Sequence, residues 1–363
     1  MSDESGPMRC LVAKGSDSTD SSAGVASPRV EGFVVLDLLG TGGYSRVYRA
    51  RQIGFDRAVA LKVLNVGIET DDQQRSFERE CRAMGVLSQH PNIVTVFNAA
   101  VTATRQPCIA MELYSGGTLG DRVRNSGPLG TNEVLDIGVR IAGALQSAHD
   151  RGVVHRDIKP QNIFVSEYGQ PALGDFGISS FDDDRTISGG GGLTVHYAPP
   201  ELIEGEPASA ASDVYSLAAS LFTLASGERP FRRHDGQTLG ELARQILVQP
   251  APRLDGPVGL ADLLEQSMAK SPAARPVTAA EFGIGLRAIQ RELGLAETEI
   301  VTASAVTAGS GATKTADPDD SETIVSEAIV SRAGASGGGV GAGETNDDRI
   351  SGLGHWARRG LVA

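Results

Sequence analysis

The hydrophobic pattern in the first third of the chain predicts β-strands. Short runs rich in valine, leucine and isoleucine are separated by turn residues, which is typical of an antiparallel sheet. The predicted strands are residues 33–39, 45–52, 58–64, 93–101 and 107–113. One helix is predicted among them, over residues 71–88, with Asp71 and Asp72 placed to cap it and to favour its positive end.

After the turn SGGTL at residues 115–119 the hydrophobic period changes to that of helices. Apolar residues recur at a spacing of three to four in two long segments and in several shorter ones. The predicted helices are residues 133–150, 213–226, 238–248, 258–269 and 278–292. The two patterns together predict an α+β fold with two lobes, a small antiparallel β-rich N-terminal lobe and a larger helical C-terminal lobe.

Both ends of the sequence have compositions that favour disorder. Residues 1–30 are rich in Ser, Asp and Gly, and residues 295–363 consist largely of Ala, Gly, Ser, Thr and acidic residues. Such segments bury too little apolar surface to offset the entropy lost on ordering. We therefore expect one folded domain over residues 31–294.

Charge and cysteine usage narrow the functional classes. The formal net charge of −12 argues against a nucleic-acid binder, which would carry a basic surface. Cys10, Cys81 and Cys108 are scattered and lack metal-site spacing, which suits a reducing compartment. The sequence contains neither a secretory signal pattern nor an apolar run long enough to span a bilayer. We expect a cytoplasmic protein that binds neither nucleic acid nor membrane.

A glycine-rich segment lies between the first two predicted strands. Glycines let backbone N–H groups approach phosphate oxygens closely. A dinucleotide-binding motif would continue into a helix and a P-loop would end in Gly-Lys-Ser/Thr, and this segment does neither. By itself such a segment is most often only a turn; the alternative is a phosphate-binding loop, in which Leu39, Gly40, Thr41, Gly42, Gly43 and Ser45 would border a nucleotide.

A lysine on the third predicted strand is a second candidate. Lys62 stands in a strongly apolar run, and a buried ammonium near phosphates needs an opposing carboxylate. The helix that follows carries Glu78 and Glu80. We expect Glu80 to pair with Lys62 and Glu78 to face solvent.

The densest chemistry lies in the run His155-Arg156-Asp157-Ile158-Lys159-Pro160-Gln161-Asn162, which follows a long predicted helix. Asp157 could accept the proton of an attacking hydroxyl, and Lys159 would neutralise charge on a transferred phosphoryl group. The amide oxygen of Asn162 and the carboxylate of Asp175 would hold a metal ion. One or two protein oxygens together with substrate phosphates suit Mg²⁺.

In this order, the motifs resemble those of a eukaryotic-type serine/threonine protein kinase in its bacterial form, closest to an actinobacterial cytoplasmic group. They read GTGGYS, Lys62, Glu80, HRDIKPQN, DFG at 175–177 and Pro199-Pro200-Glu201. Residues 90–94, residues 212–216 and Arg275-Pro276 also match. The resemblance covers roughly residues 33–293, and Lys159 implies serine or threonine as the acceptor.

The resemblance implies ATP and Mg²⁺ as cofactors, protein substrates, and further site residues. Lys62 would hold the α- and β-phosphates, and Asn162 and Asp175 would share the metal ions. The adenine ring would meet the gatekeeper Met111, the Glu112 carbonyl, the Tyr114 N–H, and the side chains of Val47, Ala60 and Phe164. An apolar stack coupling the first helix to the DFG segment would consist of Met84, Val96, His155 and Phe176.

The segment from Asp175 to Glu201 resembles a kinase activation segment. Arg156 would meet a phosphate placed there by autophosphorylation, and Thr186 and Ser188 are the expected regulatory acceptors. Thr194 matches the threonine that kinases place near the catalytic base.

Four positions depart from the family pattern, namely Ser45, Leu193, Val195 and Pro199. None removes a catalytic group, and Glu201 can still pair with Arg275.

Two other functional classes remain open. A small-molecule phosphotransferase would share the lysine and the two aspartates, but it would lack Pro200-Glu201, the helix start at Asp213 and the hydroxyls of the activation segment. A non-catalytic scaffold would tolerate loss of Lys62, Asp157 or Asp175, and all three are present.

Acidic residues flank two threonines of the C-terminal tail, Thr298 and Thr323. Such sites resemble phosphothreonines that forkhead-associated domains read through arginine-rich pockets. A forkhead-associated partner that binds the tail is therefore a hypothesis, beside that of a featureless tail.

Overall fold

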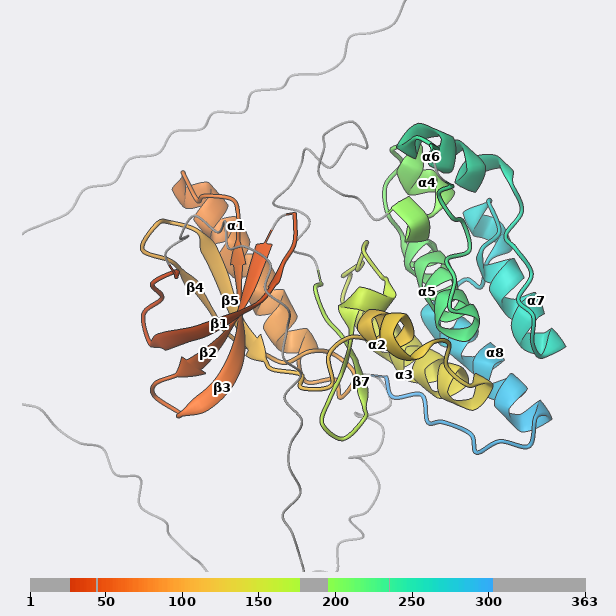
Figure 1. Cartoon of the computed structure of the whole chain (residues 1–363), viewed down its shortest axis with the longest axis horizontal. Helices are drawn as coiled ribbons and strands as arrows, with labels where there is room; N and C mark the ends of the chain where they lie inside the picture. The colour runs from red at the N-terminus through yellow and green to blue at the C-terminus, as the bar shows by residue number, and fades with distance from the viewer. Residues whose placement is uncertain (1–26, 44, 177–194, 235, 303–363) are drawn as a thin grey trace, which may run out of the picture. The chain divides into compact units, whose positions relative to one another are not determined.

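A computed structural model describes residues 27–43, 45–176, 195–234 and 236–302. These residues form a lobe built on one β-sheet and a lobe built on helices, joined after β5 (Figure 1). The predicted α+β architecture is confirmed. Among the described residues, no helix has the length and apolar character to cross a membrane.

The N-terminal lobe contains one antiparallel sheet in the order β1-β2-β3-β5-β4. Its strands are β1 (Phe33–Thr41), β2 (Ser45–Gln52), β3 (Arg57–Leu64), β4 (Val96–Val101) and β5 (Pro107–Glu112). β3 lies at the centre of the sheet, and its last six residues, from Val59 on, are all buried. A charged residue on this strand, such as Lys62, is therefore buried and needs a partner of opposite charge.

Helix α1 (Asp71–Leu87) begins one residue earlier than a cap at Asp71 would require. The N-cap is Thr70, whose Oγ1 accepts the N–H of Gln73 at 3.2 Å while Gln73 Oε1 accepts the N–H of Thr70 at 3.1 Å. Asp71 and Asp72 lie in the first turn, where their charge still favours the positive end of the helix.

The strand predicted over 93–101 is shorter in the structure, because its first residues bond elsewhere. Ile93 bridges Leu173 of the C-terminal lobe, and the Val94 N–H donates to Leu173 O at 3.0 Å. Their apolar side chains are buried, as the pattern suggested, but their backbones pair with β7.

The C-terminal lobe packs its helices around α3 and α5, which are buried along most of their length. The helices are α2 (Leu119–Ser126), α3 (Thr131–His149), α4 (Pro200–Ile203), α5 (Ala210–Ser226), α6 (Leu239–Val248), α7 (Val258–Ser267) and α8 (Ala279–Glu292). The short ladder β6 (Ile163–Val165) and β7 (Pro171–Leu173) and the 3₁₀ turns η1 (Pro160–Asn162), η3 (Val195–Tyr197) and η4 (Pro272–Ala274) complete it. The pattern did not predict α2, which is short and has few apolar residues.

The packed chain continues beyond Gly294, where the composition predicted the start of a disordered tail. Thr298 is only 7 % exposed, and Leu295 and Ile300 pack against the main core. The described structure ends at residue 302, so residues 303–363 of the predicted tail lie outside it.

Candidate active site

The side chains expected to carry out the transfer lie together around η1. Lys159 Nζ lies 2.8 Å from Asp157 Oδ2. Asn162 Nδ2 donates to the same oxygen at 3.1 Å and to the Asp157 carbonyl at 2.7 Å. The turn made by η1 brings Asn162 back to Asp157, and 31 % of the Asp157 side chain remains exposed.

Lys62 of the sheet lobe and Asp175 of the helical lobe form an ion pair. Lys62 Nζ lies 2.8 Å from Asp175 Oδ1, and Lys62 is only 8 % exposed. Burial opposes ionisation of Asp175, but the positive charge of Lys62 and the hydrogen bond from its ammonium group outweigh burial and hold the pKa of this carboxyl below its ordinary value. The two lobes therefore meet at a lysine and a carboxylate that stays ionised.

Asp175, which the sequence assigned to the metal ion, is a carboxylate that meets Lys62 here. Asp175 adopts a backbone φ of +67°, in the left-handed region, and its side chain reaches Lys62. Glu80 lies half-buried on α1, and Glu78 is exposed, as the sequence predicted. Pairing of Lys62 with Glu80 stays a prediction.

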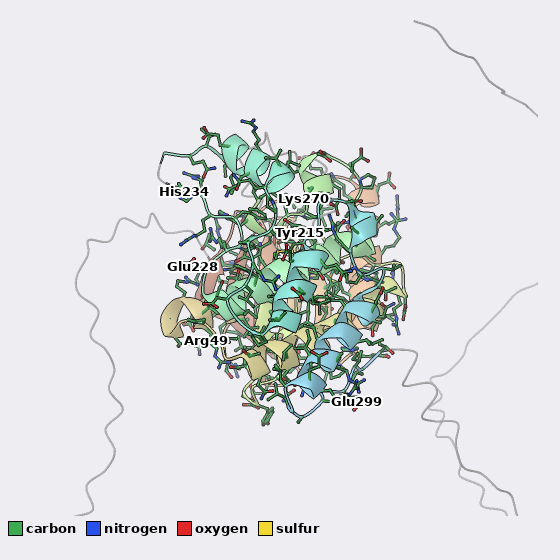
Figure 2. All side chains as sticks on the ribbon, turned by 90° about the vertical axis from the view of Figure 1, so that its right-hand side faces the viewer. Arg49, Tyr215, Glu228, His234, Lys270 and Glu299 are labelled. Carbon is green, nitrogen blue, oxygen red and sulfur yellow. The ribbon has the colours of Figure 1, made fainter. Side chains whose placement is uncertain are left out.

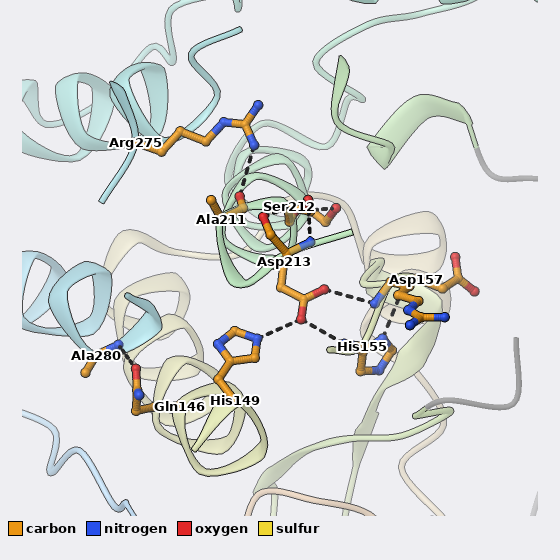
Figure 3. Close-up of polar contacts among 12 residues, drawn as sticks. Gln146, His149, His155, Asp157, Ala211, Ser212, Asp213, Arg275 and Ala280 are labelled. Carbon is orange, nitrogen blue, oxygen red and sulfur yellow. Dashed lines mark hydrogen bonds and ion pairs between the residues drawn. The ribbon is translucent and has the colours of Figure 1, made fainter. Parts of the chain in front are cut away.

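A buried aspartate that sequence reasoning treated only as a helix start fixes the backbone of residues 155–162, here called the catalytic loop (Figure 3). Asp213 is fully buried, and its carboxylate accepts the N–H groups of His155 at 2.8 Å and Arg156 at 2.9 Å. It also contacts His149 Nε2 at 2.8 Å. Arg156 has a φ of +71°, a conformation that persists only where the surroundings hold it. A charge at the start of an otherwise apolar helix was the signal available in the sequence.

The residues expected to enclose adenine share one apolar cluster. Ala60 and Met111 are buried in it, and Val47, Tyr114 and Phe164 pack against them. Ala60 pairs with Met111 across β3 and β5, which sets both on the same side of the sheet. Glu112 is the last residue of β5, so Tyr114 lies just beyond the sheet, on the connection to the helical lobe.

The expected apolar stack also assembles. Met84, Val96 and Phe176 line one small cavity beside Gly174 and Asp175. The ring of His155 lies 4.5 Å from that of Phe176, and His155 Nε2 lies 2.9 Å from the Gly174 carbonyl oxygen. Helix α1, β4 and the catalytic loop therefore meet around the segment that carries Asp175.

The glycine-rich segment forms the turn between β1 and β2. The Gly42 N–H donates to Ser45 O at 2.8 Å, which closes the turn. A Cβ added at Gly40 or Gly43 would meet no atom within 4 Å, so the backbone there is open to a ligand. Leu39, Gly40 and Thr41 belong to the end of β1, and Ser45 and Val47 to the start of β2.

These residues fit ATP and Mg²⁺ by their chemistry. The apolar cluster suits a purine ring, the open glycine backbone and Lys62 suit phosphates, and the oxygens of Asn162 and Asp175 are the hard ligands that Mg²⁺ prefers. Asn162 and Asp175 are held close because the Gly174 N–H donates to Asn162 O at 2.9 Å.

The end of the activation segment is anchored as the sequence suggested. Arg275 Nη1 and Nη2 each lie 2.7 Å from a Glu201 oxygen, and the pairing predicted for these two residues is confirmed. Val195 lies in η3, and Pro199 is the N-cap residue of α4. Gly177, Thr186, Ser188, Leu193 and Thr194 lie outside the described residues.

The site has the features of a nucleotide-dependent phosphotransferase. Between a β-lobe and a helical lobe it holds a lysine, a carboxylate suited to a metal ion, and an aspartate placed to act as a base. The family model described as "Protein kinase domain" matches residues 33–281. The chain belongs to the protein kinase domain family, as its motifs indicated.

Curated relatives carry kinase names. Serine/threonine-protein kinase PknK of Mycobacterium bovis is 42 % identical over 273 residues, which cover 74 % of this chain and 24 % of the relative. PknL of the same organism is 34 % identical, covering 73 % of this chain and 67 % of the relative. The chain thus matches about a quarter of the length of PknK.

A solved structure shows the same fold. The crystal structure of the Mycobacterium tuberculosis PknI kinase domain, determined on a point mutant, aligns with a TM-score of 0.55 and 28 % identity. The alignment covers 73 % of this chain and 98 % of that chain.

Proposed function

We propose that this protein is an ATP-dependent serine/threonine protein kinase that transfers the γ-phosphoryl group of ATP to protein hydroxyls. The observation that carries the proposal is the joint presence of the Lys62–Asp175 ion pair and the Asp157–Lys159–Asn162 cluster. The curated names of the relatives support it. A scaffold without activity would not need these charged groups to converge.

In the proposed mechanism, the chain's own residues bind, orient and neutralise. Lys62 would hold the α- and β-phosphates, and Asn162 and Asp175 would hold Mg²⁺, whose charge would neutralise that of the phosphates. Asp157 orients the acceptor hydroxyl and takes up its proton. Lys159, 2.8 Å from Asp157, stabilises charge on the transferred group.

The adenine ring is assigned to the apolar cluster around Ala60 and Met111. Val47 and Phe164 would enclose it, and the Glu112 carbonyl and Tyr114 N–H would fix its orientation. This arrangement places the ring beside the end of β5 at Glu112, where the chain crosses to the helical lobe.

The proposal extends to regulation and partners. Autophosphorylation at Thr186 or Ser188 would give Arg156 a phosphate to bind. The Arg156 N–H donates to Asp213 Oδ1 at 2.9 Å, so the backbone of Arg156 is already held in place. A forkhead-associated partner would read phosphothreonine in the tail, at Thr298 or Thr323. We further propose a cytoplasmic location and a kinase domain spanning residues 31–294, on which residues 295–302 pack before the tail continues.

The test is incubation of the purified chain with labelled ATP and Mg²⁺ beside an Asp157→Asn variant, followed by mapping of phosphate by mass spectrometry. With the unmodified chain we expect label on Thr186 or Ser188 and on added protein substrates. With Asp157→Asn we expect no label on either. ATP binding without any transfer would contradict the enzymatic proposal, and absence of ATP binding would contradict the whole assignment of the site.

A further inference from the structure

The chain beyond α8 turns back across the helical lobe. Residues 295–302, here called the strap, leave the end of α8 and run beneath α3 (Figure 1). Glu299 marks the strap at the surface of the helical lobe (Figure 2). The composition of this segment favours disorder, so specific contacts must hold it in place.

One of these contacts buries a threonine between two exposed glutamates. Thr298 is 7 % exposed, whereas Glu297 and Glu299 are exposed. The Thr298 hydroxyl donates to Asp136 Oδ1 at 2.8 Å and accepts from Gln290 Nε2 at 2.9 Å. The Thr298 N–H donates to Gln290 Oε1 at 2.9 Å. A buried amide on α8 and a carboxylate on α3 therefore recognise this residue.

A second contact depends on glycines in the helices beneath the strap. A Cβ added at Gly143 of α3 would lie 2.4 Å from the Val301 carbonyl oxygen, which no real contact allows. A Cβ at Gly283 of α8 would lie 3.4 Å from Ile300 Cδ1. The strap backbone thus occupies a slot that exists because α3 has no side chain at position 143.

The strap also reaches the connection between α1 and β4. His90 Nε2 donates to Val301 O at 2.9 Å, since His90 Nδ1 accepts the Asn92 N–H at 3.0 Å. Asn92 Nδ2 in turn donates to Pro171 O of β7 at 2.8 Å. The last part of the strap is therefore bonded to the loop between α1 and β4, which is itself bonded to β7 of the helical lobe.

We propose that Thr298 is a phosphorylation site that acts as a release switch for the strap. The docked strap hides the hydroxyl, and a phosphorylated Thr298 cannot dock again. This inference rests on the proposed kinase activity. Thr298 Oγ1 would form a bond to the γ-phosphorus of ATP as the bond to the β,γ-bridging oxygen breaks; ADP leaves, and Asp157 of the phosphorylating copy takes the hydroxyl proton.

The docked geometry cannot accept the phosphate. A phosphothreonine carries a charge of about −1.5 to −2 and lacks the hydroxyl proton that Asp136 now accepts. The nearby cations already have partners: Arg140 pairs with Asp136 at 2.9 Å, and Arg287 and Arg291 pair with Glu297. Gln290 is fully buried and Thr298 is only 7 % exposed, so little solvent is available there to hydrate a phosphate. Release would expose Thr298 with its flanking glutamates to a phosphothreonine reader.

The sharpest test changes the slot and leaves Thr298 intact. Gly143→Ala should force the strap off α3, and Gly240→Ala is a matched control, because a Cβ there meets no atom within 4 Å. We expect Gly143→Ala to raise the initial rate of Thr298 phosphorylation by about tenfold or more, because the rate follows the population of the open strap. Gly240→Ala should leave the rate unchanged. Ile300→Ser, which alters only the strap, should act like Gly143→Ala.

The second arm measures docking without using the kinase reaction. Hydrogen exchange of the backbone amide at position 298 is measured in two variants. It should be fast in Thr298→Glu, which mimics the phosphate, and slow in Thr298→Ser, which keeps the hydroxyl. Equal exchange in the two variants would overturn the proposal, as would equal Thr298 phosphorylation in Gly143→Ala and Gly240→Ala while a generic protein substrate is labelled. Loss of label on the generic substrate as well would count against the proposed kinase activity, and the exchange arm would then decide on the switch alone.

Discussion

Arg275 and Glu201 form a two-pronged ion pair in the interior of the helical lobe. Nη1 and Nη2 of Arg275 lie 2.7 Å from Oε1 and Oε2 of Glu201, and the Arg275 side chain is fully buried. Ser212 donates to Glu201 Oε1 at 2.8 Å. The pair fixes the end of the activation segment to the turn before α8, although the two residues are 74 positions apart.

Removal of one partner of this pair should be costly. Arg275→Met would leave Glu201 buried with its charge uncompensated, and we expect the free energy of unfolding to fall by about 3–5 kcal/mol. Arg253→Met is the matched control, because Arg253 is 52 % exposed in its pairing with Asp262. Its loss should leave the free energy of unfolding nearly unchanged, because exposed ion pairs contribute little. Urea denaturation of both variants checks this, and similar losses in the two would contradict it.

The same pair should make stability depend on pH. Burial raises the pKa of Glu201, but hydrogen bonds from Arg275, its own backbone N–H and Ser212 outweigh burial and hold the pKa below its ordinary value of 4.5. The unfolded chain binds this proton more readily, so the contribution to stability is present above pH 4.5 and is lost as the pH falls through the folded-state pKa. The difference in free energy of unfolding between the unmodified chain and Glu201→Gln should therefore shrink on acidification. A constant difference from neutral pH downward would rule this out.

Substitution of the proposed base should affect transfer and spare nucleotide binding. Asp157→Asn keeps the shape of the side chain beside Asn162 but cannot take up a proton, and we expect kcat to fall by about 10²–10⁴-fold. ATP affinity, measured by calorimetry, should change little because Asp157 faces the acceptor. Asp262→Asn, at a side chain that is 58 % exposed, is the control and should retain full activity. An active Asp157→Asn variant would show that another group serves as base.

Asp213 should act as a positioning residue. In Asp213→Asn an amide N–H₂ would face the donors of His155, Arg156 and His149, so one buried donor would lose its acceptor, at a cost of about 1–3 kcal/mol. Because the backbone of the catalytic loop would shift, kcat should fall while KM for ATP stays nearly constant. Parallel changes in kcat and KM would indicate a general loss of folded protein instead, and a melting curve of the same sample separates the two cases.

Gly174 should control the shape of the adenine cluster. A Cβ at this position would lie 2.7 Å from Phe164 Cε2 and 2.9 Å from Val94 Cγ2. Gly174→Ala should push the Phe164 ring out of place, raise KM for ATP, and destabilise the fold by about 1–3 kcal/mol through overpacking. Gly240→Ala again serves as control. Unchanged nucleotide binding in Gly174→Ala would argue against the role assigned to Phe164.

Much of the site could be predicted because several of its functional residues lie close together in the sequence. Asp157, Lys159 and Asn162 lie within six positions, and η1 brings them together with little help from the rest of the fold. The ladder between β3 and β5 follows from two apolar runs, and it sets Ala60 beside Met111 as the resemblance implied. The spacing of hydrophobic residues was thus enough to predict the strands of the sheet and the long helices.

Contacts between distant segments could not be predicted in this way. The pattern placed Ile93 in the five-stranded sheet, but its pairing with Leu173 depends on where the other lobe lies. The helix cap at Thr70 was missed because two aspartates beside it carry the stronger local signal. The pairing of Lys62 with Asp175 joins residues on different lobes, and the conformation of Asp175 decides it.

The sequence by itself determined the two-lobed architecture, the order of the motifs and the family, because hydrophobic period and short motifs are local properties of the chain. The tertiary structure decided that Asp175 meets Lys62, that Asp213 holds the catalytic loop, and that a tail of disordered composition docks at Thr298. Each of these depends on burial and hydrogen bonding between segments far apart along the chain, and Thr298 and Asp136 are separated by 162 positions. Such pairings depend on how the helices pack, which no local pattern encodes.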